Sequence, residues 1–403
     1  MPISDPKALA GSVQQDVLAW RRHLHRHPEL SFQEVETSSF VADTLASFGG
    51  LLITRPTPTS VMARLQGASP GPVLALRADM DALPVAEEND FAFRSASPGR
   101  MHACGHDAHT AMLLGVAKAL SGSRGELAGE VRFLFQHAEE QLPGGAQQMV
   151  DAGVMEGVDV VLGAHVWATL DVGKVGVMAG PVTAAPDTFR IEVLGRGGHA
   201  AQPNLTVDPI AIGAQLVASL QQIASRNRDP LAGLVVSVTQ FHAGTADNII
   251  PESAELAGTV RSFDERLRAD VEARMEQIAH GVCSAHGAEC SFHYERGYRP
   301  VVNDPEVTLW LGEALNDTFG ADRVVTDGLV TMAGEDFSAY LTRAPGSFFM
   351  IGARNAAKGI VHPHHHPRFT VDEDALAVGV QAFLAAVPAV LRRAAARRAQ
   401  SEV

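Results

Sequence analysis

The chain has 403 residues, of which 46% are hydrophobic and 19% are charged, and 46 acidic residues outnumber 32 basic ones to give a net charge of -14. This composition supplies enough apolar side chain for a large core and excludes a disordered protein. A surface of this sign repels phosphate backbones, so we expect no nucleic acid as partner. The length predicts two or three domains at about 150 residues each.

The sequence shows neither a membrane span nor an export signal. No stretch approaches the roughly 18 consecutive apolar residues that a span needs. The first 13 residues lack the basic segment and apolar segment of a secretion signal. Three cysteines are too few for a disulfide framework, and Cys283 and Cys290 are interpreted as structural. We therefore expect a cytoplasmic protein with no membrane partner.

The first part of the chain alternates amphipathic helices with short apolar runs. The pattern predicts three helices, at residues 12–26, 108–120 and 144–152, and three buried strands, at 73–76, 131–135 and 158–162. Such alternation is typical of a mostly parallel sheet with helices on both faces.

The pattern changes near residue 180, where Pro181 and Pro186 interrupt the chain. The predicted order then becomes strand, helix, strand, strand, helix, strand, at residues 189–194, 208–225, 234–241, 254–261, 265–280 and 290–295. This is the split-βαβ, ferredoxin-like order, in which two helices cover an antiparallel sheet. Beyond it, helix–strand alternation resumes and ends with a strand at 348–351.

The fold class predicted from these patterns is α/β, with a smaller domain inserted into a larger one. The larger domain comprises residues 1–183 and 297–403 and holds the mostly parallel sheet. The inserted α+β domain comprises residues 184–296, with hinges near 181–186 and 297–300.

Polar side chains follow three of the predicted strands of the larger domain. Asp79 and Asp81 follow the first strand, Glu139 and Glu140 the second, and His165 the third. Because ligands of open α/β sheets bind beyond the carboxyl ends of the strands, we expect these residues to converge on one crevice. Two loops, at 101–107 and 362–369, can bring further thiol and imidazole groups to it.

The side chains available in this crevice favour a transition metal, because thiolate, imidazole and carboxylate together form its ligand set. Cys104 and His106 lie on a short glycine-containing loop before a predicted helix, where we expect the thiol to lose its proton readily. Alone, this Cys-x-His pattern is equally compatible with a buried free cysteine beside a capping histidine.

The adjacent carboxylates Glu139 and Glu140 indicate a metal more strongly. They repel each other unless a cation lies between them or one of them holds a proton. On an extended segment, neighbouring side chains point in opposite directions, so we expect one to bind metal and the other to face the substrate. A metal hydrolase needs this pair of roles, a ligand and a general base for metal-bound water.

Two further groups of histidines carry less information. His23, His25 and His27 lie in a predicted helix with the wrong spacing for convergence, so we interpret them as a helix end or a substrate rim. In the run at 362–366, one or two histidines at most can reach a single metal site.

Ten segments of the chain resemble the aminoacylase-like metallo-amidohydrolases, most closely the hippurate hydrolases, bacterial N-acyl-amino-acid amidohydrolases and plant auxin-conjugate hydrolases. They are HRHPELSFQE (25–34), RADMDALP (77–84), MHACGHDAHTAMLLG (101–115), HAEE (137–140), GAHVW (163–167), GRGGHAAQP (195–203), NIIP (248–251), GTVRSF (258–263), AGEDFS (333–338) and HHPRF (365–369). The resemblance spans most of the chain in order and spacing.

For the larger domain, the resemblance implies a catalytic centre with two divalent metal ions per subunit, Mn, Zn or Co. The implied ligands, carried over motif by motif, are Cys104, His106, Glu140, His165 and His365. Glu139 would be the general base, and Asp79 and Asp81 would orient ligand imidazoles.

For the inserted domain, the resemblance implies a lid that also forms a homodimer. His199 would polarise the scissile carbonyl, within its own chain or across the dimer. Asn248 and Arg261 would hold the α-carboxylate of the substrate.

The activity implied is the metal-dependent hydrolysis of a small N-acyl-amino acid to a carboxylic acid and a free amino acid. A dipeptidase and an N-acetyl-diaminopimelate-type deacetylase are alternatives within the hydrolases. From a different class, a non-catalytic metal-binding relative is a further alternative, although Glu139 argues against it because binding alone needs no base.

Overall fold

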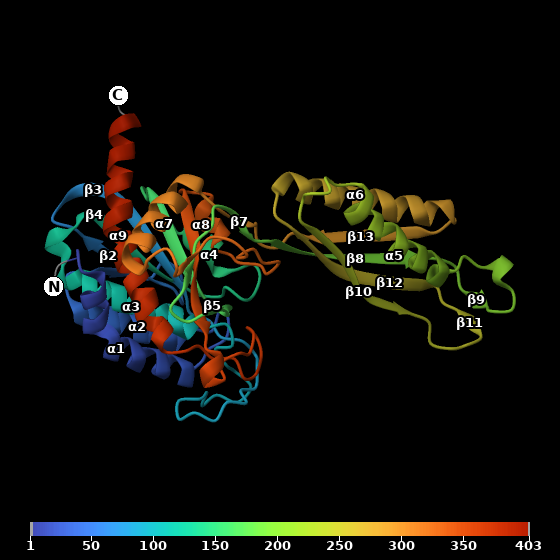
Figure 1. Ribbon diagram of the computed structural model, residues 1–403. Helices are drawn as coiled ribbons and strands as arrows, with labels where there is room; N and C mark the ends of the chain where they lie inside the picture. Colours follow the sequence, from blue (N-terminus) through green and yellow to red (C-terminus); the bar gives the residue numbers. More distant parts are fainter. Residues whose placement is uncertain (1–2, 402–403) are drawn as a thin grey trace. The chain divides into compact units, whose positions relative to one another are not determined.

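The computed structural model describes residues 3–401 and divides into two compact units, each with its own hydrophobic core (Figure 1). Unit 1 comprises the described residues up to Val182, Val302–Val330 and those from Asp336 onward. Unit 2 comprises Thr183–Val301 and Thr331–Glu335, and it contains the segment 184–296. The pair of strands β7 (Gly180–Thr183) and β14 (Val301–Asn303) lies where the chain passes from one unit to the other.

Unit 1 is built on an eight-stranded sheet with the order β1-β2-β4-β3-β5-β16-β6-β15. The central pairs β4–β3, β3–β5 and β5–β16 are parallel, as is β6–β15, while the remaining pairs are antiparallel. The strands are β1 (Leu52–Thr54), β2 (Val61–Gln66), β3 (Ser69–Asp79), β4 (Ala128–Gln136), β5 (Val160–Asp171), β6 (Val175–Gly176), β15 (Val324–Val325) and β16 (Gly346–Arg354). The predicted mostly parallel sheet is confirmed.

Helices cover both faces of this sheet, and two neighbouring residues of β16 show how. Phe349 packs on Phe383 of α9 with ring centroids 5.1 Å apart, whereas Phe348 packs on Phe337, next to α8, also at 5.1 Å. Successive side chains of a strand point to opposite faces, so α9 and α8 lie on opposite sides. The helices of unit 1 are α1 (Pro6–Arg26), α2 (Val35–Phe48), α3 (His106–Gly122), α4 (Gly145–Asp151), α7 (Pro305–Phe319), α8 (Ser338–Leu341) and α9 (Asp374–Ser401).

Helix α9 is long and apolar enough to cross a membrane by length and composition, but most of its apolar part is buried. Of its most apolar 18-residue window, 72% is buried inside the protein. Its side chains join those of α1, α3 and α7 in the main core of unit 1. This burial accounts for its apolar composition.

Unit 2 has a four-stranded antiparallel sheet with the order β10-β12-β8-β13, covered on one face by two helices (Figure 1). Phe189, Ile191 and Val193 alternate along β8 and are buried in a core shared with these helices. The elements are β8 (Ala185–Leu194), α5 (Pro209–Arg226), β10 (Leu234–Ala243), β12 (Ser253–Ser262), α6 (Glu265–Ala285) and β13 (Glu289–Glu295), with the short pair β9 (Gly198–His199) and β11 (Ile249–Ile250). The predicted ferredoxin-like order is confirmed.

Candidate active site

The chemistry-bearing residues of unit 1 gather around His106, the first residue of α3. Its Nδ1 lies 2.9 Å from the backbone oxygen of Asp81 and 3.1 Å from Asp81 Oδ1, so it donates its hydrogen to Asp81. Its Nε2 is buried and has no hydrogen-bond partner among residues 3–401. Three carboxylates face this nitrogen, with Asp79 Oδ2 at 3.8 Å, Glu140 Oε1 at 3.9 Å and Glu139 Oε2 at 4.0 Å. A buried nitrogen that can bind a metal and is surrounded by negatively charged oxygens forms a favourable site for a cation.

The electrostatics of His106 support the same conclusion. Burial by itself lowers the pKa of His106, but the carboxylates of Asp79, Asp81 and Glu140 outweigh burial and raise the pKa to about 10. The pocket thus carries excess negative charge, and in the absence of another cation it retains a proton on this ring.

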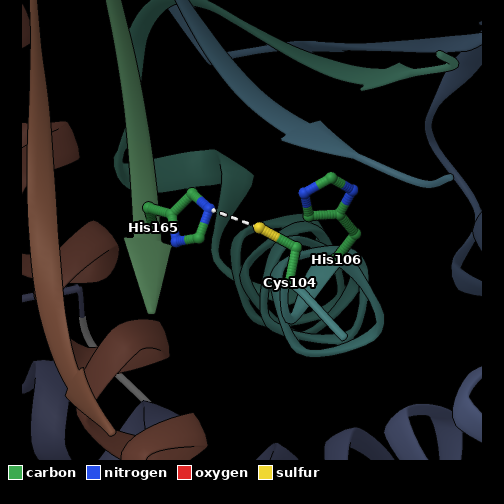
Figure 2. Close-up of side chains that lie close together, drawn as sticks. All are labelled: Cys104, His106 and His165. Carbon is green, nitrogen blue, oxygen red and sulfur yellow. Dashed lines mark hydrogen bonds between the residues drawn. The ribbon is translucent and has the colours of Figure 1, made fainter. Parts of the chain in front are cut away.

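Cys104 and His165 lie next to His106, as Figure 2 shows. Cys104 Sγ is 3.4 Å from His165 Nε2, and His165 Nδ1 donates to the backbone oxygen of Val166 at 2.6 Å. This second bond turns the unprotonated nitrogen of His165 toward the thiol. Gly105, between Cys104 and α3, has φ +105°, and a Cβ there would lie 2.4 Å from Val166 Cγ2, so no other residue fits without movement.

The expectation that Cys104 loses its proton readily is wrong for the metal-free protein. Burial raises the pKa of the Cys104 thiol well above its usual range, and Glu140 and Glu139 raise it further. These effects outweigh the start of α3, so we conclude that ionisation of the thiol requires a bound cation.

Glu139 and Glu140 do not lie on an extended segment, which corrects a second expectation. Strand β4 ends at Gln136, and Ala138 adopts φ +49° in the bend that follows. Both carboxylates therefore approach the same nitrogen of His106 instead of pointing in opposite directions. The Glu140 amide donates to Asp81 Oδ2 at 3.0 Å, which ties the bend to the end of β3.

The histidine run separates into three environments. His365 Nε2 lies 3.3 Å from Glu140 Oε1, so its ring belongs to the cluster around His106. His364 packs edge-on against His165 with ring centroids 5.1 Å apart, and its Nε2 accepts the amide hydrogen of Ala168 at 3.1 Å. His366 stacks on His362 with ring centroids 4.4 Å apart.

Ligand atoms of these residues come within 4.8 Å of one another in several groups of three. The groups that fit a metal are Cys104 with His106 and His165, Cys104 with Glu140 and His365, and His106 with Glu139 and Glu140. A further group contains Asp79, His106 and His109. It is less suited to a cation, because Asp79 already accepts hydrogen bonds from the guanidinium group of Arg77 and from the ring of His109. The thiolate, imidazole and carboxylate donors that converge here fit a divalent metal ion.

His109, which the sequence analysis did not single out, holds this group together. Its Nδ1 donates to Asp79 Oδ1 at 2.6 Å, and its Nε2 accepts the Val166 amide hydrogen at 2.9 Å. Asp79 also receives a hydrogen bond from Arg77 at 2.6 Å. His109 follows His106 by three residues on α3, so helical spacing was the signal that could have revealed it.

The early histidines lie at a helix end, one of the two interpretations that their spacing allowed, because His23 and His25 are in the last turn of α1 and His27 is its C-cap. His25 is fully buried, with Nδ1 2.8 Å from Asp107 Oδ2 and Nε2 3.0 Å from Glu87 Oε1. Arg21 donates to the same oxygen of Asp107 at 2.9 Å. This network fixes the first turn of α3, which carries His106, to α1.

The remaining predicted residues lie in unit 2. His199 in β9 pairs with Ile249 in β11, and Asn248, the residue before Ile249, accepts the Ala200 amide hydrogen through its backbone oxygen at 3.0 Å. Both His199 and Asn248 are exposed. Arg261 lies in β12 and is half-buried, and this burial lowers its pKa, against the opposing charge of Asp187.

Known proteins match this chain over most of its length. A model described as peptidase family M20/M25/M40 matches residues 75–389. An N-acyl-L-amino acid amidohydrolase of Geobacillus stearothermophilus is 61% identical over 300 residues, which are 74% of this chain and 81% of the relative. Thermostable carboxypeptidase 1 of Saccharolobus solfataricus is 42% identical over 379 residues, 92% of this chain and 94% of the relative.

A solved structure agrees with these relatives. The Bacillus subtilis YXEP protein, described as a dinuclear metal binding peptidase from M20 family, superimposes with a TM-score of 0.82 at 37% identity and covers 95% of this chain and 99% of its own. The family match, the relatives and the donor set around His106 agree with the resemblance found in the sequence. The chain therefore belongs to peptidase family M20/M25/M40, and it is a metal-dependent amidohydrolase.

Proposed function

We propose that the protein hydrolyses the amide bond of N-acyl-amino acids, releasing a carboxylic acid and a free amino acid, with Glu139 as the general base. One observation carries the proposal. The Nε2 of His106 is buried without a hydrogen-bond partner among residues 3–401. It lies within about 4 Å of two adjacent carboxylates, of which one can bind a cation and the other can move a proton. The N-acyl-L-amino acid amidohydrolase at 61% identity supports the same substrate class.

The proposed centre holds two divalent ions, Mn, Zn or Co, in each subunit. Its ligands are Cys104, His106, Glu140, His165 and His365. Cys104 belongs to two of the ligand groups, one with His106 and His165 and one with Glu140 and His365. Because Cys104 is common to both groups, its thiolate would serve as a ligand for a metal held by either of them.

Each protein group has a defined task in this mechanism. The metal, when bound, supplies a Lewis acid that makes nearby water more acidic and polarises the amide carbonyl. Glu139 accepts a proton from the attacking water and returns it to the departing amine. Asp81 keeps the hydrogen of His106 on Nδ1, so that Nε2 is free to act as a ligand.

We assign recognition and assembly to unit 2, as a lid and dimerisation domain, and chemistry to unit 1. His199 would donate to the developing oxyanion, and Asn248 and Arg261 would hold the α-carboxylate of the substrate. Strand β10 is at an edge of the four-stranded sheet, and a symmetric partner can cover such an edge. We propose a homodimer formed in this way, acting on a small molecule in the cytoplasm.

A second candidate is an exopeptidase, and the carboxypeptidase among the relatives favours it. In both candidates the nitrogen of the cleaved amide belongs to an amino acid with a free carboxylate. They differ in the group on the other side of the bond, an acyl group or a further residue. A deacetylase for N-acetyl-diaminopimelate is a special case of the first.

A substrate panel tests the proposal. The purified protein is loaded with Mn, Co or Zn and given N-acetyl-amino acids, N-benzoyl-amino acids and dipeptides, and the released amine is measured with ninhydrin. We expect turnover of the N-acyl-amino acids and a large loss when their carboxylate is blocked as an amide. Turnover of the dipeptides alone would favour the exopeptidase, and no turnover of any substrate would favour a binding protein.

A further inference from the structure

The bend that carries Glu139 and Glu140 is held by two buried carboxylates, one on each side. The Glu140 amide donates to Asp81 Oδ2 at 3.0 Å, and the Ala138 amide donates to Glu34 Oε1 at 2.8 Å. Glu139 lies between these two anchored amides. The direction of its side chain therefore depends on both.

Glu34 lies at the start of α2, far from the bend in sequence, and is fully buried. Its Oε1 accepts a second amide hydrogen, from Phe32 at 3.0 Å. Phe32 and Ala138 have φ values of +65° and +49°, a region that residues other than glycine rarely adopt. One oxygen thus holds two strained positions, and strain of this kind persists only where the surroundings enforce it.

The segment that carries Glu34 contacts the same site at further points. Ser31 donates its hydroxyl hydrogen to Asp81 Oδ2 at 2.7 Å, the oxygen that also receives the Glu140 amide. The ring of Phe32 meets that of His137 edge-on at 5.6 Å. Residues 31–34 therefore join the end of β3 to the bend after β4.

Placing a carboxyl group here is unfavourable, which indicates a specific role. Burial raises the pKa of Glu34 to about 7, and the nearby charge of Asp81 contributes to this increase. Its second oxygen, Oε2, is buried and makes no hydrogen bond of ordinary length among the described residues, and the Thr59 side chain offsets only part of the pKa increase. A position that served only to begin α2 would be satisfied by an exposed capping side chain.

We infer that Glu34 is a positioning residue: by holding the Ala138 amide it fixes the bend so that Glu139 and Glu140 both face His106. Among the described residues, Glu34 belongs to none of the candidate ligand groups, and it acts through the backbone of the bend. The inference rests on the proposal that Glu139 is the base and Glu140 a ligand, and it extends that proposal to a residue about 100 positions away in the sequence.

The test compares three variants of Glu34 with a matched control. Glu34→Ala removes the hydrogen-bond acceptor, whereas Glu34→Gln keeps an oxygen that can accept hydrogen bonds from the same two amides. Glu34→Asp keeps the carboxylate, but its side chain is shorter by one methylene group. The control is Glu29→Ala, because Glu29 also accepts two amides at the start of α2, from Glu36 at 3.2 Å and Thr37 at 2.7 Å, but does not contact the bend.

At saturating metal we expect Glu34→Ala and Glu34→Asp to lower kcat about 10–100-fold with little change in KM, as misplacement of a catalytic group does. Glu34→Gln should retain kcat within about threefold, and Glu29→Ala should do the same even where its Tm falls. If Glu34→Ala is too unstable to purify, the comparison of Glu34→Asp with Glu34→Gln still shows whether the position of the acceptor oxygen or the charge of the side chain determines kcat.

A second readout needs no activity. In the metal-free protein, amide hydrogen exchange of the peptide that contains residues 138–140 should be faster in Glu34→Asp than in wild type and unchanged in Glu29→Ala. Wild-type kcat in Glu34→Ala and Glu34→Asp, or equal losses in Glu34→Gln and Glu34→Asp, would overturn the inference. Normal turnover by Glu139→Gln would instead overturn the proposed base and leave the exchange result to decide the role of Glu34.

Discussion

The two units place their functional side chains in opposite environments. Around His106, most of the rings and carboxylates of unit 1 are held by other buried groups, as Asp81 holds His106 and Asp79 holds His109, and His365 is the exposed member of the cluster. In unit 2, His199 and Asn248 are exposed on a short pair of strands. A buried hydrogen-bond network can hold ligand side chains in position before an ion binds. Exposed side chains lack such a network and are held in position only when a substrate or a partner contacts them. This contrast supports the proposed division of chemistry and recognition between the units.

The largest effect should come from the residue that the proposed ligand groups share. Cys104→Ala should lose activity to the limit of detection and bind fewer metal equivalents than His165→Ala, because Cys104 is in two groups and His165 in one. Metal content by elemental analysis after dialysis measures this. The control is Cys283→Ala, which alters a buried thiol of unit 2 and should leave both metal and activity unchanged. Full metal content in Cys104→Ala would refute the shared ligand.

Next in size is the loss of the base. Glu139→Gln should keep the metal and lower kcat by about 10³–10⁴-fold, because an amide cannot accept and return the proton. Glu140→Gln, one position along, should instead lose metal. Identical metal content and identical kcat in the two variants would mean that the adjacent carboxylates do not have separate roles.

In unit 2 the expected effect is smaller and leaves the metal in place. His199→Ala should lower kcat about 10²–10³-fold, as removal of an oxyanion donor does, with unchanged metal content. The exposed His286, at the end of α6, provides a control, and His286→Ala should behave as wild type. Mixing Glu139→Gln and His199→Ala subunits should recover part of the activity if His199 acts across a dimer. No recovery after demonstrated subunit exchange would place its action within one chain.

The smallest effect concerns stability and its dependence on pH. Burial raises the pKa of Glu34 from 4.5 to about 7 in the folded protein, so its favourable contribution is present below pH 4.5 and is lost as the pH rises to 7. Metal-free Glu34→Gln should therefore gain stability relative to wild type over this range, by up to about 3 kcal/mol. Denaturant unfolding at pH 4.5, 6 and 7.5 measures the difference, and a difference that is constant with pH would contradict the raised pKa.

The sequence predicted the fold class, the order of elements in the inserted segment and the family. These features can be predicted because they depend on local patterns, namely the periodicity of apolar residues and the positions of turn residues. The polar residues that follow β3 and β4 were also found in this way, since strand ends are visible in the sequence.

The supporting network was not predicted, because its partners are far apart along the chain. His25 meets Asp107 across 82 residues, and Glu34 meets Ala138 across 104. The orientation of Glu139 and Glu140 depends on the left-handed conformation of Ala138, and alanine gives no local signal for that conformation. The expected acidity of Cys104 failed for the same reason, because burial among distant carboxylates outweighs the nearby start of a helix.

We propose that the cluster around His106 is a metal centre at which Glu139 moves the proton of amide hydrolysis. The most direct test is to strip the wild-type protein and Glu139→Gln with a chelator and titrate Mn, Co or Zn back while following hydrolysis of an N-acetyl-amino acid. We expect no turnover by either stripped protein, equal metal uptake by both, and restored turnover in the wild type alone. Full turnover by the stripped wild type, verified by elemental analysis, or by reloaded Glu139→Gln, would contradict the proposal.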